Sequence, residues 1–289
     1  MMLQKNLFCT VLKNAQQTKT AIAAINVFND LTSRAVVKAA ERVFRPVILQ
    51  PSTGTVRRYG VEAFARLAEN AKAAAQVPVV LHLDHCTDDN LARACVRAGW
   101  DSVMMDFSTL PYEENVKRTR RMVDYAHIYG VAVEGEIGII RGIEEEVSHD
   151  TASLATYEET ADYIRETGID AIAPAIGTAH GVYETQPELD FALVEQLGNQ
   201  PVPVVIHGGT GLSNEDFERL IACGAAKINI STALKQVYLG AVRSALEQKN
   251  LTPLGFDDAV EKACCARIEA FIRLFASEKV DVYADQLPG

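Results

Sequence analysis

Eight short apolar runs alternate with longer amphipathic stretches along the chain, and this alternation limits the fold more than any other feature of the sequence. The runs are rich in β-branched residues and apolar throughout, which is typical of strands buried on both faces. We expect strands at Ile22–Phe28, Pro46–Gln50, Val79–His85, Ser102–Asp106, Ala132–Ile137, Ala171–Ala175, Val204–His207 and Ala226–Ile230. We expect helices at Leu31–Val43, Val61–Gln76, Asp89–Ala98, Tyr112–Ile128, Thr156–Thr167, Asp190–Leu197, Asn214–Cys223 and Thr232–Gln248. Eight strand–helix units in one chain predict a (β/α)8 TIM barrel.

The length of 289 residues fits one such barrel, which takes roughly 250 residues. No linker or low-complexity segment divides the chain, so we expect a single domain over residues 1–289, with a C-terminal helical tail from about 249 to 289. A doubly wound open sheet is the alternative. It is less favoured because eight units match closure and no GxGxxG motif follows the first strand.

Composition and charge exclude several classes of partner. The chain is 48% hydrophobic and 23% charged, and its net charge of -10 argues against binding to nucleic acid or to an anionic membrane surface. No apolar run approaches the roughly 20 residues that span a bilayer, and the first nine residues are too short and polar for a signal peptide. The six cysteines are scattered without CxxC spacing, a pattern that fits reduced thiols rather than disulfides. Because thiols stay reduced in the cytosol, we expect a cytoplasmic protein.

Three of the six histidines lie at the ends of predicted strands. His85 and His207 are the last residues of their strands, and His180 follows its strand through a short turn. Neutral imidazoles that converge from strand ends suit a divalent metal such as zinc, with a coordination position left for substrate. A single histidine after a strand is more often a turn residue or a polar cap. Cys86 is a poor candidate ligand because neighbouring residues on a strand point to opposite faces, and His82 is expected to have a structural role.

Acidic residues accompany these histidines. Asp84 precedes His85 and can act as a general acid and base, although a role in orienting a histidine is the alternative. Glu134 and Glu136 share one face of the fifth predicted strand. A loop of roughly twenty residues follows, and loops of this length are often mobile flaps.

A glycine-rich run, His207-Gly208-Gly209-Thr210-Gly211-Leu212, leads into a predicted helix. Its backbone N–H groups can hold a phosphate, and the next strand ends in the polar run Asn229-Ile230-Ser231-Thr232. The loops after the seventh and eighth strands form the usual phosphate site of a TIM barrel.

Several motifs run over nearly the whole chain: Leu81-His82-Leu83-Asp84-His85, Ser102-Val103-Met104-Met105-Asp106, Leu110-Pro111-Tyr112-Glu113-Glu114-Asn115, Glu134-Gly135-Glu136-Ile137-Gly138, Ala175-Ile176-Gly177-Thr178-Ala179-His180-Gly181, His207-Gly208-Gly209-Thr210-Gly211 and Lys227-Ile228-Asn229. Taken together, they resemble the class II, metal-dependent aldolases of the fructose- and tagatose-bisphosphate family. The sequence around His180 is most similar to the tagatose-type branch.

The resemblance implies a role for each matching residue. His85, His180 and His207 match zinc ligands, and Asp106 and Glu136 match carboxylates that hold a displaced or second metal ion, divalent or monovalent. Asp84 matches the acid/base at the C4 oxygen, and Glu144 matches a flap glutamate that exchanges a proton at C1. The matches to phosphate-binding residues are Gly181, Gly208, Thr210, Asn229 and Thr232 at the C1 phosphate, and Ser52 and Arg267 at the distal phosphate.

The implied reaction is the reversible cleavage of a ketose 1,6-bisphosphate into dihydroxyacetone phosphate and an aldehyde, in which zinc polarises the C2 carbonyl. Arg267 resembles an arginine lent by a neighbouring subunit, which implies a homodimer or homotetramer. A few residues depart from the family pattern, which leaves the distal substituent and the sugar stereochemistry open: Phe107, Arg141, Ile143, Glu184 and Ala233. A ketose 1-phosphate with a distal sulfonate, such as 6-deoxy-6-sulfofructose 1-phosphate, is therefore an alternative substrate.

Three other interpretations remain at this point. A class I Schiff-base aldolase requires a desolvated lysine, for which Lys227 is the one strand-end candidate, and leaves three histidines unexplained. A metal-dependent barrel hydrolase would place a His-x-His pair on the first strand, where Ala24-Ile25-Asn26-Val27 lacks it. The third is a non-catalytic phosphosugar-binding or assembly subunit.

Overall fold

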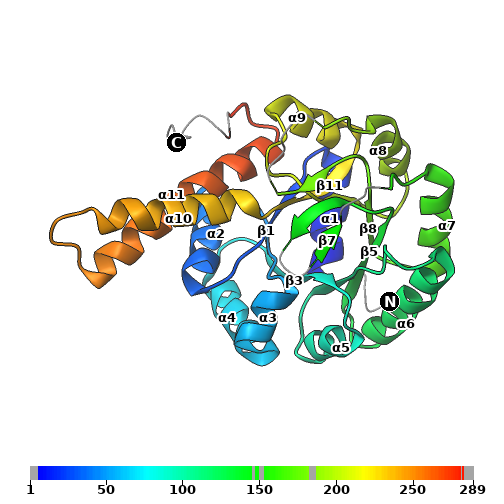
Figure 1. Cartoon of the computed structure of the whole chain (residues 1–289), viewed down its shortest axis with the longest axis horizontal. Helices are drawn as coiled ribbons and strands as arrows, with labels where there is room; N and C mark the ends of the chain where they lie inside the picture. The colour runs from blue at the N-terminus through cyan, green and yellow to red at the C-terminus, as the bar shows by residue number, and fades with distance from the viewer. Residues whose placement is uncertain (1–5, 145–146, 150–152, 182–186, 281, 283–289) are drawn as a thin grey trace.

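The computed structural model describes residues 6–144, 147–149, 153–181, 187–280 and 282. Eight parallel strands close into a barrel in the order β1-β11-β10-β8-β5-β4-β3-β2 (Figure 1). Their bounds are β1 Ile22–Ile25, β2 Val47–Leu49, β3 Val79–Cys86, β4 Ser102–Met105, β5 Ala132–Ile137, β8 Ala171–Pro174, β10 Val204–Ile206 and β11 Ala225–Ile230. The predicted TIM barrel is confirmed, and each of its strands coincides with a predicted apolar run.

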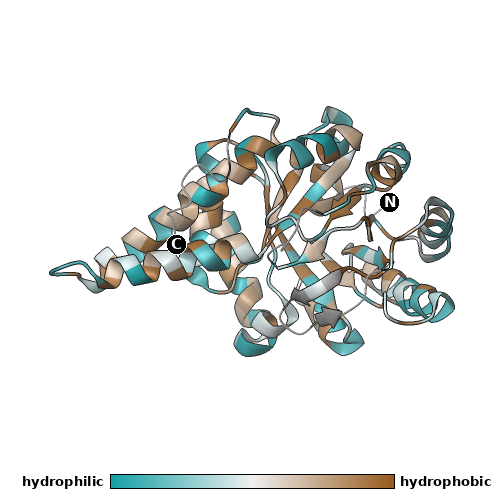
Figure 2. Cartoon of the chain, turned by 45° about the horizontal axis from the view of Figure 1, so that its top comes forward, coloured by the Kyte–Doolittle hydropathy of each residue, from teal (hydrophilic) through white to brown (hydrophobic). Residues whose placement is uncertain are grey.

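Amphipathic helices surround the barrel, with brown apolar residues toward the strands and teal polar residues outside (Figure 2). Their bounds are α2 Asp30–Arg42, α4 Val61–Ala74, α5 Asp89–Arg97, α6 Tyr112–Ile128, α7 Tyr157–Thr167, α8 Phe191–Gly198, α9 Asn214–Cys223 and α10 Thr232–Leu246. Several begin at residues that cap backbone N–H groups. Ser213 and Asp216, for example, form a capping box at the start of α9.

The C-terminal tail forms one long helix, α11, over Pro253–Phe275. Its buried face carries Ile268, Phe271 and Phe275 and packs on α2, α9 and α10. The far ends of α10 and α11 extend away from the barrel as a helical hairpin (Figure 1). Large exposed apolar side chains on this hairpin are Leu239, Leu246 and Leu254.

An additional helix, α1, spans Leu7–Thr18 and closes the N-terminal end of the barrel, which the sequence analysis did not predict. Phe8 and Leu12 are fully buried against the apolar side chains that line the interior near the strand starts. These side chains are Ile22, Ala24, Ile48, Val80, Ala132, Ala171, Ala173, Val205 and Ala226. The barrel interior is therefore a closed apolar core at this end.

A small sheet lies outside the barrel, with its three strands in the order β7-β6-β9. Strands β6 (Arg141–Glu144) and β7 (Val147–His149) form an antiparallel hairpin within the predicted flap, and β6 pairs in parallel with β9 (Ala179–His180). A Cβ atom at Gly142, whose φ is 118°, would lie 2.4 Å from the carbonyl oxygen of His180. Glycine is thus required for the flap strand to approach the segment that carries His180.

One short helix, α3 (Thr53–Tyr59), follows β2 and was also not predicted. Ser52 caps it by accepting a hydrogen bond from the backbone N–H of Thr55 at 3.2 Å. Among the described residues, no helix is both long enough and apolar enough to cross a lipid bilayer.

Candidate active site

The polar strand-end residues gather at the C-terminal end of the barrel, where the chemistry of this fold is located. The local backbone at His85 departs from a regular strand. Its φ is 41°, and the pairing of β3 with β4 shifts register between Leu83 and Cys86. This left-handed residue interrupts the alternation of side chains, so Asp84 and His85 both serve the site while Cys86 packs in the outer apolar core.

The three predicted ligand histidines are brought together. His85, His180 and His207 are all buried, and one nitrogen from each lies within 4.8 Å of the others. The His85 ring centroid is 4.9 Å from that of His180 and 4.6 Å from that of His207. Gly208 allows this approach, because a Cβ there would lie 2.3 Å from the carbonyl oxygen of Ala179.

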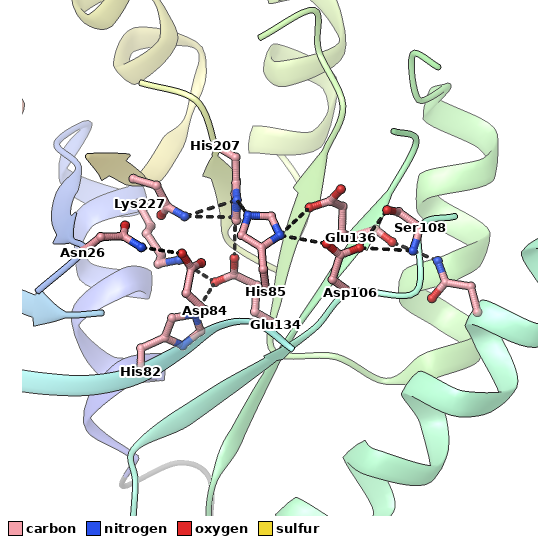
Figure 3. A network of polar contacts seen from close by, with 12 residues as sticks. Asn26, His82, Asp84, His85, Asp106, Ser108, Glu134, Glu136, His207 and Lys227 are labelled. Carbon is pink, nitrogen blue, oxygen red and sulfur yellow. Dashed lines mark hydrogen bonds and ion pairs between the residues drawn. The ribbon is translucent and has the colours of Figure 1, made fainter. Parts of the chain in front are cut away.

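The hydrogen bonds of two rings direct their remaining nitrogens toward each other (Figure 3). His85 Nδ1 lies 2.8 Å from Asp106 Oδ2, and His207 Nε2 lies 2.9 Å from Glu134 Oε1. A carboxylate accepts hydrogen bonds, so these two nitrogens carry hydrogen. The opposite atoms, His85 Nε2 and His207 Nδ1, are 2.8 Å apart and require a proton or a metal cation between them. The donor set therefore fits a divalent cation.

His85 also belongs to a second group of residues that could hold a metal ion. Its other members are the carboxylates of Asp106 and Glu136. Burial opposes ionisation of Asp106, but hydrogen bonds from His85 and Ser108 hold its pKa well below the usual range. Burial and the Asp106 charge raise the pKa of Glu136 well above its usual value. Although burial acts to lower the pKa of His85, the carboxylates of Asp84, Asp106 and Glu136 raise it strongly.

Asp84 is held at the end of a chain of side-chain amides. Asn26 Nδ2 donates to Asp84 Oδ2 at 2.7 Å, and Gln50 Nε2 donates to Asn26 Oδ1 at 3.1 Å. All three residues are buried, and Ser52 forms an isolated bridge with Asp84. The carboxylate thus has a fixed orientation beside the histidines.

Below the histidines lies a fully buried ion pair that the sequence analysis did not assign to the site. Lys227 Nζ is 2.8 Å from Glu134 Oε2. Burial opposes ionisation of Glu134, but Lys227, His82 and His207 hold its pKa well below the usual range. Because a charged lysine is not a nucleophile, this pairing disfavours the Schiff-base interpretation.

A pocket beside the histidines brings the predicted C1-phosphate residues together. It is lined by His180, Gly181, Gly208, Gly209, Thr210, Asn229, Ser231, Thr232 and Lys235. The α10 helix begins here, and its first turn presents backbone N–H groups, one of which (Ala233) bonds Thr210 Oγ1 at 3.2 Å. Ser231 Oγ is buried and has no hydrogen-bond partner among the described residues, so its hydroxyl can donate to a bound group. These features suit an anion.

One member of the pocket lining, Lys235, lies outside the runs that the sequence analysis named for the phosphate site. The helical spacing from Thr232 to Lys235 was a signal for the lysine, since residues three apart share a helix face.

Arg267 is not brought to this pocket. It lies on α11, on the outside of the barrel, and donates a hydrogen bond to the carbonyl oxygen of Val282. The backbone of Glu144 ends β6, whereas its side chain and the whole of Glu184 lie outside the described residues.

Comparison with known proteins places these features in context. The family model for class II fructose-bisphosphate aldolase matches residues 7–279. A fructose-bisphosphate aldolase of Geobacillus stearothermophilus is 38% identical over 82% of this chain and 84% of its own length. A sulfofructosephosphate aldolase of Alkalicoccus urumqiensis is 32% identical over 93% of this chain and 96% of its own. The crystal structure of the YdjI aldolase from Escherichia coli K12 superposes with a TM-score of 0.83 at 33% identity, covering 94% of this chain and 97% of that one.

Proposed function

Because this chain belongs to the class II fructose-bisphosphate aldolase family and is therefore an aldehyde-lyase, we propose that it cleaves a ketose 1,6-bisphosphate of the tagatose or fructose type into dihydroxyacetone phosphate and an aldehyde. The observation that carries the proposal is the shared position of His180. This residue belongs both to the buried histidine cluster and to the lining of the anion pocket. A substrate phosphate in that pocket is thereby held next to the metal-binding nitrogens.

His85, His180 and His207 would hold the metal, with zinc as the proposed ion, and Asp106 and Glu136 would hold a displaced or second cation. The bound metal would polarise the C2 carbonyl and stabilise the negative charge that develops when C3–C4 breaks. Because the three histidines are buried, this electrostatic contribution would be large.

Asp84 is the proposed general base in cleavage, taking the C4 hydroxyl proton and returning it in condensation. The amide chain from Gln50 through Asn26 supports this role, because it occupies Oδ2 and fixes the carboxylate plane. We propose, on the basis of the family motif alone, that Glu144 exchanges the proton at the hydroxymethyl carbon of dihydroxyacetone phosphate, which is C1 in the numbering of the triose and C3 of the ketose.

The C1 phosphate is proposed to bind through Gly181, Gly208, Thr210, Asn229 and Thr232. We add Lys235, which is the lysine of the pocket lining. In a chain with a net charge of -10, a phosphate dianion needs a local cation of this kind.

The distal anion is proposed to meet Ser52 and the Arg267 of a second subunit. Arg267 donates to the carbonyl oxygen of Val282 and does not line the C1-phosphate pocket of its own chain, which supports its supply by a neighbouring copy. The exposed leucines on the α10–α11 hairpin offer apolar surface for a homodimer or homotetramer. A fully active monomer would contradict this arrangement.

A distal sulfonate is the second candidate, favoured by one observation. The relative named sulfofructosephosphate aldolase aligns over 93% of this chain, whereas the fructose-bisphosphate aldolase of G. stearothermophilus aligns over 82%.

The test is a coupled assay for the release of dihydroxyacetone phosphate from four ketose 1-phosphates. Two carry a phosphate at C6, one in the fructose and one in the tagatose series; the third carries a sulfonate at C6, and the fourth has a neutral C6. We expect kcat/KM to be highest for one of the C6 anions and to be abolished by chelation. Arg267→Ala should raise KM for that substrate and leave the neutral one unchanged. Equal activity on the neutral substrate would contradict the distal-anion proposal, and release of no product from any of them would contradict the reaction.

A further inference from the structure

The Glu134–Lys227 ion pair crosses the interior of the barrel. Glu134 comes from β5 and Lys227 from β11, two strands separated in the sheet by β8 and β10, and both side chains are fully buried. Glu134 contacts His207 on one side and lies beside His82 on the other (Figure 3). His82 in turn stacks on Phe8 of α1.

Both oxygens of Glu134 are occupied. Oε2 accepts from Lys227 Nζ at 2.8 Å, and Oε1 accepts from His207 Nε2 at 2.9 Å. His82 Nε2 lies 3.5 Å from Oε2, and its ring is fixed by Ser102 Oγ at 2.7 Å and by stacking on Phe8. The carboxylate therefore cannot rotate without losing the lysine or the histidine.

This fixed carboxylate determines how His207 presents its ring. Because Nε2 donates to Glu134, Nδ1 has no hydrogen of its own and faces His85 Nε2 at 2.8 Å. Asn229 Nδ2 lies 3.2 Å from both ring nitrogens, so it does not by itself select one ring orientation. The selection comes from Glu134.

A buried ion pair is weak evidence for stability, since apolar residues of similar volume often stabilise a fold as well or better. The pair thus needs another explanation, and the hydrogen bond between Glu134 and His207 links it to the strand-end cluster. We propose that Glu134 and Lys227 are positioning residues, with Lys227 anchoring the carboxylate that holds His207 Nδ1 toward the metal. The inference rests on the proposed role of His207 as a metal ligand.

The test measures metal binding rather than turnover. Glu134→Gln/Lys227→Met removes both charges together, which avoids leaving either one buried alone. We expect its affinity for Zn²⁺ to fall roughly 10- to 100-fold, with an altered visible absorption spectrum of the Co²⁺ form and an apo-protein melting temperature close to that of the wild type. The matched control is Asp101→Asn/Lys72→Met, which removes an ion pair away from the histidines and should keep the wild-type affinity.

A His207→Ala background separates positioning from a general structural effect. If the pair acts through His207, the double substitution should cause no further loss of Zn²⁺ affinity in that background. Wild-type affinity in Glu134→Gln/Lys227→Met, or an equal additional loss without His207, would overturn the inference. If the double variant does not fold, Glu134→Asp serves as a second variant, because its shorter side chain keeps the charge but moves it away from His207. Wild-type affinity for Zn²⁺ in Glu134→Asp would likewise overturn the inference. A wild-type protein that binds no metal would instead contradict the proposed function.

Discussion

The inward-facing side chains of β3 and β5 change in character from one end of the barrel to the other. On β3 they run from Val80 through His82 to Asp84, and on β5 from Ala132 through Glu134 to Glu136. The N-terminal end is closed by α1 and holds apolar groups, whereas the C-terminal end holds buried carboxylates and imidazoles. Apolar burial stabilises the fold, while burial of charges opposes it. We infer that one end supplies stability and the other uses part of it to position polar groups.

The largest expected effect is at the polar end. Asp84→Asn should lower kcat for cleavage by roughly 10²–10⁴, because the general base is lost while the hydrogen bond from Asn26 can persist. The prediction is tested by steady-state assays of the variant, with its metal content measured in parallel. The control variant is Asp89→Asn on α5. A variant that loses its metal instead would show that Asp84 mainly orients the histidines.

At the apolar end, Phe8→Ala should lower the free energy of unfolding by about 3–5 kcal/mol, because a fully buried aromatic ring leaves a cavity under the barrel. We expect kcat/KM at low temperature to stay within a few-fold of the wild type. Denaturant unfolding and the coupled assay provide the two measurements, with the exposed Phe44→Ala as control. A matching loss of activity would break the comparison by showing that His82, which stacks on Phe8, transmits changes to the site.

A smaller effect is expected in the anion pocket. Lys235→Ala should raise KM for dihydroxyacetone phosphate in the condensation direction by roughly 10- to 100-fold, which corresponds to a charge-assisted hydrogen bond of about 1.5–3 kcal/mol. The KM for unphosphorylated dihydroxyacetone should not change, and the control is Lys262→Ala on α11. Equal losses with both substrates would assign Lys235 to the structure of the pocket.

The smallest effect is expected outside the barrel, where Glu261 on α11 binds Arg34 and Lys38 on α2. Burial opposes its ionisation, but these partners lower its pKa. Its contribution is therefore present above the pKa of an unfolded glutamate and is lost as pH falls through the folded value. Glu261→Gln should cost about 0.5–1 kcal/mol near neutral pH, since both cations are half-exposed.

The prediction is tested by unfolding midpoints measured near neutral pH and again below the pH range in which glutamate titrates. The control is Glu218→Gln, at an exposed position. A difference between wild type and variant that persists at low pH would show that packing, not charge, accounts for the effect.

The sequence predicted the eight barrel units because each strand and helix carries its own apolar pattern. It also predicted His85, His180 and His207 as a group, since strand ends in a closed barrel converge. The Glu134–Lys227 pair was not predictable in the same way, because the partners are 93 residues apart and meet only through closure of the sheet. The backbone conformation of His85 was likewise hidden, since nothing in the residue type signals a φ of 41°.

Helix α1 was missed for a related reason, although the spacing of Phe8, Val11, Leu12 and Ala15 is amphipathic. Its partner is not a neighbouring helix but the underside of the whole barrel. The amphipathic spacing can therefore be assigned to a helix that covers the barrel end only after the barrel itself has been predicted.

The position of α1 has a consequence for the order in which the chain folds. Asn6 donates hydrogen bonds to the carbonyls of Asp101 and Gly130, and Gln16 donates to those of Gly198 and Gln200, up to 184 residues away. Contacts so distant along the chain slow folding, because long loops must close first. During synthesis the helix precedes every barrel strand, yet its docking surface is complete only after β11 has been added. A helix that leaves the ribosome before every barrel strand is thus among the last elements of the barrel to reach its native place.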